Sequence, residues 1–324
     1  MSNKENGMRE LTKTTGFDVI GDIHGYAGAL FALLEQMGYK KTIYGYSHPS
    51  RTAIFVGDFI DRGPGQLAVI ETVRDMIENG NALSVMGNHE LNAIGWFCKD
   101  NQGNYLRPHS EKNHHQHSEF LRQIGENTAT HNEWVQWFLS LPVWLDLPEL
   151  QVTHACWHPE KMKELLPFLS SENTLKQQEL PVFFTHKHPA FSAIEAIMKG
   201  IETSLPQGSF FVDNNGLRRT KTRVKWWSSN ERYCDRDIMP SDVIKNLTNE
   251  PLTEELSQLM HVRKPTFIGH YWLTGIPFIE HKHIACLDYS VAKSGKLVAY
   301  RHNSGENLNN NKFVWIENKQ HKKD

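Results

Sequence analysis

The first third of the chain repeats one pattern three times: a short apolar run ends, a glycine follows, and polar side chains of metal-binding type come next. The three sites are residues 17–20 followed by GDIHG (21–25), residues 52–56 followed by GDFIDRG (57–63), and residues 82–85 followed by GNHE (87–90). Helical periodicity over residues 27–37 and 65–78 separates these runs. This alternation of strand and helix predicts a βαβ layer with a mostly parallel sheet, in which ligands gather where the strands end.

Two later strands are predicted to end in the same way. Residues 151–153 lead directly into His154, and residues 265–268 lead into Gly269 and His270. Elsewhere we expect helical segments at 119–140, 159–208 and 240–262, a hairpin of 209–212 and 217–227 around the turn 213–216, and antiparallel strands at 284–287, 296–300 and 312–316. No linker-like stretch divides the chain, so we expect one domain over residues 1–324, with 155–262 inserted as a helical and hairpin cap.

Composition narrows the class of protein. The chain carries 35 Lys and Arg against 37 Asp and Glu, a formal net charge of −2 that gives no strong nucleic-acid signal. Hydrophobic residues make up 39% and charged residues 22%, which suits a globular fold. The polar N-terminus and the lack of any run of about 18 apolar residues predict neither a signal peptide nor a membrane partner. Four widely spaced cysteines fit a reducing compartment, so we expect a cytoplasmic protein.

The five strand ends together present a mixed set of oxygen and imidazole donors. The candidate metal ligands are Asp22, His24, Asp58, Asn88, His154 and His270. This set favours divalent ions such as Mn, Fe, Zn or Ni over calcium. Six ligands exceed what one catalytic ion needs, so two ions that share one carboxylate explain them better, with a typical separation of about 3.5–4 Å.

The three N-terminal motifs, in this order, resemble those of the calcineurin-like metallophosphoesterases. The sub-group is that of serine/threonine phosphoprotein phosphatases and bacterial dinucleoside tetraphosphatases. The resemblance covers residues 17–90 most strongly, and 151–154 and 266–300 to a lesser degree. It implies an α/β, four-layer sandwich in which two mixed β-sheets are flanked by helices, with a partial cap insertion.

The resemblance also implies how the donors are shared between two divalent ions, with Mn²⁺ as our first choice. Asp22, His24 and Asp58 look like ligands of the first ion, and Asp58, Asn88, His154 and His270 look like ligands of the second. Asp58 would then bridge the two ions. In the family pattern the attacking group is a hydroxide between the metals, and no covalent enzyme intermediate forms.

Three further residues match positions with catalytic roles in the family. His89 resembles the general acid that protonates the leaving oxygen, and Asp61 resembles the carboxylate that orients it. An unbound histidine beside the site needs such a partner to act as an acid at neutral pH. Arg62 resembles a phosphate clamp, because a planar guanidinium matches two phosphoryl oxygens.

The chain departs from phosphoprotein phosphatases in ways that weaken the case for a protein substrate. Residues 154–157 read HACW where those enzymes usually have His-Gly-Gly, and no Ser-Asp-Pro element is found. A second phosphate-binding arginine must then come from elsewhere, and we choose Arg223 from the basic segment 218–225. The adjacent Trp226 and Trp227 are interpreted as core residues in preference to a base-stacking platform.

These observations favour a metal-dependent phosphoesterase whose substrate is a small nucleotide, especially a dinucleoside polyphosphate of the diadenosine tetraphosphate type. Alternatives are a serine/threonine phosphoprotein phosphatase, an enzyme acting on RNA ends, and an inactive binding module that keeps the fold. A second histidine cluster, formed by His109, His114, His115 and His117, is interpreted as part of a solvated polar segment over residues 104–118 rather than as a site.

Overall fold

The computed structural model describes residues 14–205, 208, 210–212, 218–227 and 262–318. The first sheet runs in the order β14-β15-β1-β4-β5, with β16 paired to β15. Its strands are β1 (Gly16–Ile20), β4 (Arg51–Phe55), β5 (Ala82–Ser84), β14 (Asp288–Tyr289), β15 (Lys296–Asn303) and β16 (Phe313–Glu317). Strands β1, β4 and β5 are parallel, as expected, and β15 runs antiparallel to β1, β14 and β16.

The second sheet has the order β13-β12-β7-β6. Its strands are β6 (Trp144–Asp146), β7 (Gln151–Thr153), β12 (Thr266–Ile268) and β13 (Ile284–Cys286). The predicted antiparallel pairing of residues 284–287 is wrong, because β13 runs parallel to β12. One residue, Leu287, separates β13 from β14, so the chain passes here from the second sheet to the first.

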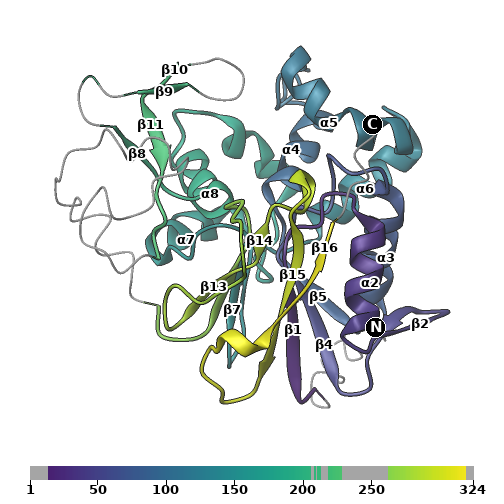
Figure 1. Ribbon diagram of the computed structural model, residues 1–324. Helices are drawn as coiled ribbons and strands as arrows, with labels where there is room; N and C mark the ends of the chain where they lie inside the picture. Colours follow the sequence, from purple (N-terminus) through teal and green to yellow (C-terminus); the bar gives the residue numbers. More distant parts are fainter. Residues whose placement is uncertain (1–13, 206–207, 209, 213–217, 228–261, 319–324) are drawn as a thin grey trace.

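Helices cover the outer faces of the two sheets, which gives the expected four layers (Figure 1). Helices α2 (Ala27–Gln36) and α3 (Gln66–Glu78) lie beside the first sheet, and α7 (Pro159–Leu165) and α8 (Pro189–Lys199) lie on the side of the second (Figure 1). Three more follow β5: α4 (Asn88–Phe97), α5 (Glu111–Ile124) and α6 (Ala129–Leu139). Smaller elements are η2 (Leu166–Phe168), η3 (Gln177–Phe184), η7 (Val291–Lys293), η8 (Asn310–Lys312) and the β2–β3 pair (Lys40–Thr42, Gly45–Ser47).

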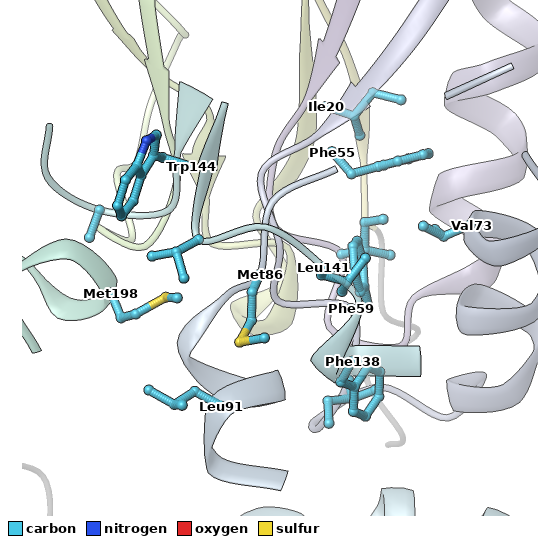
Figure 2. Packing of buried hydrophobic residues seen from close by; sticks show 14 of the residues in the cluster. Ile20, Phe55, Phe59, Val73, Met86, Leu91, Phe138, Leu141, Trp144 and Met198 are labelled. Atoms are coloured by element: carbon cyan, nitrogen blue, oxygen red, sulfur yellow. The ribbon is translucent and has the colours of Figure 1, made fainter. Parts of the chain in front are cut away.

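The strands are buried on both faces, and alternate residues face different cores. On β1, Val19 packs between the sheets with Phe267 of β12, whereas Ile20 belongs to the core beneath the helices. Figure 2 shows Ile20 and Phe55 on the sheet face that looks toward Val73 of α3. Burial on both faces explains why these strands read as continuous apolar runs. It also fixes the register of the strand ends that carry the candidate site.

Two predicted segments differ from the structure in how they are divided. The expected helix over 119–140 is two helices, because Gly125 ends α5 with a φ of 76° and Thr128 caps α6 by accepting the N–H of His131 at 3.1 Å. The strand expected at 217–227 is also broken: β10 (Arg218–Arg219) pairs with β9 (Phe211–Val212), and β11 (Lys221–Arg223) pairs with β8 (Glu202–Ser204).

Two other expectations lie outside the described residues: the hairpin turn at 213–216 and all but the last residue of the helix at 240–262. The prediction that residues 155–262 form a cap stays a prediction. Among the helices in the described ranges, none has the length and apolar character needed to cross a membrane.

Candidate metal centre

All six predicted ligands lie within one connected cluster at the strand ends. The carboxylate of Asp58 has its Oδ2 3.6 Å from His24 Nε2 and 3.4 Å from His154 Nε2. Asn88 Oδ1 lies 3.1 Å from His154 Nε2, and the rings of His154 and His270 are 5.2 Å apart. Asp22 joins through its Oδ2, which accepts the backbone N–H of His270 at 3.0 Å. Strands of both sheets therefore deliver donors to one place.

Two of the histidines are oriented as metal ligands usually are. His154 Nδ1 lies 2.8 Å from the carbonyl oxygen of Val56, and His24 Nδ1 lies 3.1 Å from that of Ile60. A carbonyl only accepts, so each Nδ1 carries the hydrogen and Nε2 is left as the donor atom for a cation. For His154, Nε2 faces the oxygens of Asn88 and Asp58, an arrangement that a proton on Nε2 or a bound cation makes favourable.

The charge balance of the protein alone leads to the same conclusion. Burial lowers the pKa of His154, but the Asp58 carboxylate outweighs it and raises the pKa to about 10. Burial and the nearby Asp288 carboxylate raise the pKa of Asp22 well above its usual range. Asp22 Oδ1 and His270 Nε2 are buried without any hydrogen-bond partner, which is rare for buried polar atoms unless they bind an ion or water. The donor set therefore fits divalent cations.

Two groups of side chains bring their ligand atoms within 4.8 Å of one another: His24, Asp58 and His89 form one, and Asp58, His154 and His270 form the other. Asp58 belongs to both, as a bridging role would require. Asp22 is in neither group, and the amide oxygen of Asn88 adjoins the second through His154. The sequence predicts His89 as a proton donor and not as a ligand. Its Nδ1 faces the carboxylate of Asp61, whereas the Nδ1 atoms of His24 and His154 face backbone carbonyls.

His89 and Asp61 form the predicted pair. His89 Nδ1 lies 2.5 Å from Asp61 Oδ2, and the backbone N–H of His89 donates to Asp58 Oδ1 at 3.0 Å. Burial lowers the pKa of His89, but the carboxylates of Asp58 and Asp61 reverse the effect, so the net shift is upward. For His24, burial and the neighbouring His89 lower the pKa to about 4. The two imidazoles therefore differ in their tendency to hold a proton.

The loops that carry the cluster have unusual backbone conformations. His24, Asp58, Asp61 and Arg62 all have positive φ values, between 48° and 75°, although none is glycine. Each such residue costs about 1–3 kcal/mol and persists only where its surroundings enforce it. A Cβ at Gly269 would lie 2.0 Å from Asp22 Oδ1, which explains why a glycine precedes His270. The strain is concentrated where the predicted ligands lie.

Glu90, the last residue of GNHE, has a role that the motif itself does not predict. Its carboxylate accepts three backbone N–H groups: those of Asp58 at 2.9 Å, Phe59 at 2.8 Å and Gly87 at 2.9 Å. Burial, followed by the Asp58 charge, raises the pKa of Glu90 to about 7. Glu90 thus joins the turn after β4 to the turn after β5, and so sets the spacing of Asp58 and Asn88.

His117 was also missed, and its interpretation as part of a solvated segment is wrong. Its side chain is fully buried in α5, and its Nδ1 lies 2.8 Å from Asp61 Oδ1, so Asp61 is held between two imidazoles. The signal was present in the sequence, because His117 shares the helical spacing of the apolar Phe120, Leu121 and Ile124. His114 and His115 of the same cluster are exposed, and His109 stacks on Trp96 with ring centroids 3.6 Å apart.

The two predicted phosphate-binding arginines both lie near the cluster. Arg62 is exposed; its charge helps to lower the pKa of His24 and opposes the upward shift of the pKa of His89. Arg223 is half-buried at the end of β11, and after burial its charge is the next cause of the lowered pKa of His270. Trp226 and Trp227 are both buried, as expected, and so neither offers a stacking surface.

The sequence profile of the calcineurin-like phosphoesterase family matches residues 16–270. The chain belongs to this family of metal-dependent phosphoesterases, whose chemistry requires divalent ions of the kind that the cluster around Asp58 suits.

Several curated relatives are named asymmetrical bis(5'-nucleosyl)-tetraphosphatase PrpE. The protein from Halalkalibacterium halodurans is 45% identical over 74 residues, which cover 22% of this chain and 30% of that protein. The one from Oceanobacillus iheyensis is 29% identical over 136 residues, covering 42% and 53%. The chain therefore matches about half or less of these relatives' length. A protein serine/threonine phosphatase from Saccharomyces cerevisiae has a similar fold, with a TM-score of 0.50, 14% identity, and coverage of 97% of this chain and 83% of the other.

Proposed function

We propose that the protein hydrolyses dinucleoside polyphosphates of the diadenosine tetraphosphate type, with two divalent metal ions as cofactors. The observation that carries the chemistry is the convergence of His24 and His154 on the Asp58 carboxylate, each with its Nε2 turned inward. The choice of substrate is supported by the relatives named as tetraphosphatases and by the missing elements of the phosphoprotein phosphatases.

The proposed ligands follow the cluster. Asp22, His24 and Asp58 would hold one ion, and Asp58, Asn88, His154 and His270 the other, with Mn²⁺ as our first choice. When bound, such ions polarise the phosphoryl group and make water a strong nucleophile at neutral pH. The buried backbone carbonyls of Val56 and Ile60 fix the tautomers of His154 and His24, so that both imidazoles keep their Nε2 available.

The protein's own proton donor is His89. Because Asp61 accepts the Nδ1 hydrogen, a proton carried by His89 for the leaving oxygen must be on Nε2, which is the atom turned toward the Asp58 carboxylate at 3.9 Å. Arg62, exposed beside this pair, would bind the phosphate being cleaved, and Arg223 would bind from the side of His270. A proton donor with Arg62 beside it, and Arg223 on the side of His270, suits a polyanionic substrate.

A substrate panel with product identification tests the proposal. The purified protein with Mn²⁺ should release nucleotide from diadenosine tetraphosphate much faster than phosphate from a phosphopeptide. The opposite ranking would contradict the substrate and favour the phosphoprotein phosphatase, while leaving the phosphoesterase chemistry in place. No turnover of any phosphate ester by the metal-loaded protein would instead support the inactive binding module.

Variants of the same enzyme test the assigned roles. Asn88→Ala should reduce both the metal content and kcat. His89→Ala should keep the metal content but lower kcat by about 10²–10⁴-fold, the usual contribution of one acid–base group. His115→Ala, an exposed histidine on α5, is the matched control and should behave as the unmodified protein. Unchanged turnover in His89→Ala would remove its proton role.

A further inference from the structure

Trp272 differs from every other tryptophan in the chain. All nine tryptophans lie in the described residues, and seven are buried, while Trp315 is half-buried. Trp272 alone is exposed, with 39% of its surface accessible. An indole ring is the largest apolar side chain, so leaving it in water sacrifices stabilisation that folding normally gains. The position of Trp272 in the fold indicates which ligand its exposed ring could contact.

Trp272 lies at the edge of the candidate metal centre. It follows His270 by two residues, and the two ring centroids are 6.4 Å apart. Its backbone N–H donates to the buried carboxylate of Asp288 at 2.7 Å, and its φ of 49° is in the left-handed region. Asp288 also contributes to the raised pKa of Asp22, so it is close to the cluster. The backbone that carries the indole is therefore held beside the proposed metal ligands.

A positive charge accompanies the ring. The ammonium of Lys293, from η7, lies 4.4 Å from the centroid of the Trp272 ring. Lys293 is exposed and has no carboxylate partner among the described residues. Its charge is thus attracted by the ring but not neutralised by the protein. An exposed aromatic ring and an unpaired cation, both beside a phosphoesterase centre, match the two halves of a nucleotide.

We propose that Trp272 and Lys293 form a nucleobase subsite, in which a purine stacks on the indole and the ammonium pairs with the phosphate chain of the same nucleotide. This proposal rests on the proposed function and assigns the residues that would distinguish a nucleotide from a phosphate ester without a base. Stacking of a base on an aromatic side chain contributes about 1–3 kcal/mol. That range corresponds to roughly 5- to 150-fold in affinity.

Binding of AMP and of ribose 5-phosphate, which lacks the base, separates stacking from phosphate recognition. Because Trp272 is the one exposed tryptophan, AMP should quench the long-wavelength part of the protein's fluorescence. Trp272→Ala should abolish that quenching and weaken AMP binding by about 5- to 150-fold, with a much smaller effect on ribose 5-phosphate. Trp272→Phe should restore much of the AMP affinity. Phe278→Ala, which removes another exposed aromatic of the same segment, is the control and should bind AMP normally.

Lys293→Gln tests the second half of the subsite. It should weaken the binding of AMP but not of adenosine, because the ammonium acts on the phosphate. Equal AMP affinity in Trp272→Ala and the unmodified protein would overturn the subsite. p-Nitrophenyl phosphate has no nucleobase, so its turnover by the unmodified enzyme measures the phosphoesterase chemistry separately. The subsite and the proposed function are thus able to fail independently.

Discussion

At the scale of single residues, Asp61 occupies an unusual position, because its two carboxylate oxygens each face a different buried imidazole. Oδ2 lies 2.5 Å from His89 and Oδ1 lies 2.8 Å from His117. The two contacts leave the carboxylate no freedom to rotate about its Cβ–Cγ bond without losing one of them. We therefore propose that His117 is a positioning residue that acts on His89 through Asp61.

His117→Ala should consequently lower kcat by roughly tenfold, less than the loss of His89 itself. The effect should be largest for substrates with a poor leaving group, which need a proton from His89, and small for p-nitrophenyl phosphate, whose leaving group needs little help. Steady-state kinetics with a series of phosphate esters measures this difference. A uniform loss across the series would show that His117 has only a structural role.

His131 predicts a different kind of effect, on stability. It is fully buried in α6, its Nδ1 accepts the N–H of Asn127 at 3.2 Å, and its Nε2 has no hydrogen-bond partner. Burial is the main cause that lowers the pKa of His131 to about 4. The charge of His117 adds to this effect, and the charge of Glu126 opposes it. The folded protein thus binds this proton less readily than the unfolded chain does.

Because the unfolded histidine is protonated below about pH 6.5 and the folded one is not until about pH 4, the free energy of unfolding should fall as the pH drops through this interval. The loss should be on the order of 1–2 kcal/mol. Urea unfolding at pH 7.5 and pH 5 measures it, and His131→Gln should reduce the pH dependence. The same slope in both proteins would assign the effect to other groups.

At the scale of elements, Glu90 holds the turn after β4 at a fixed distance from the turn after β5. Its three accepted N–H groups come from the turn after β4 and from Gly87 just before α4. Glu90→Gln replaces one acceptor oxygen by a donor, which then faces backbone donors in a fully buried place. Leaving such groups unpaired should cost about 2–4 kcal/mol and displace Asp58 from Asn88.

Urea unfolding and metal titration measure the two effects of Glu90→Gln, and both stability and metal affinity should fall. Glu111→Gln, in the exposed first turn of α5, is the matched control, because it removes a charge without breaking any buried contact. An unchanged metal affinity in Glu90→Gln would show that the turns keep their spacing without this carboxylate.

The same scale shows what the sequence was able to predict. The strand, glycine and donor pattern at Asp22, Asp58 and Asn88 is local, so the sequence alone places these residues at the strand ends. The contact between His117 and Asp61 joins residues 56 positions apart, and no local pattern specifies it. The single residue between β13 and β14 was also missed, because a change of sheet depends on which strands pair and not on local periodicity.

At the scale of the whole molecule, the candidate centre joins the two sheets. Asp22, Asp58 and Asn88 follow strands of the first sheet, and His154 and His270 follow strands of the second. The apolar core between the sheets, which includes Val19 and Phe267, brings these ends together. At the site itself, the protein supplies buried carboxylates, an amide oxygen and imidazole nitrogens, a set of donors that a bound cation would compensate.

Metal ions should for this reason stabilise the entire fold and not only the site. A ligand that binds the folded state alone adds about 2.7 kcal/mol of stability at a concentration 100 times its Kd. The Tm should therefore rise by roughly 5 °C between EDTA and saturating Mn²⁺, which scanning calorimetry measures. Calorimetric titration should give two ions per chain, and His270→Ala, which removes one donor of the second sheet, should weaken at least one of them. The same Tm in EDTA and in Mn²⁺, or a stoichiometry of one ion per chain, would contradict the proposed pair of ions around Asp58.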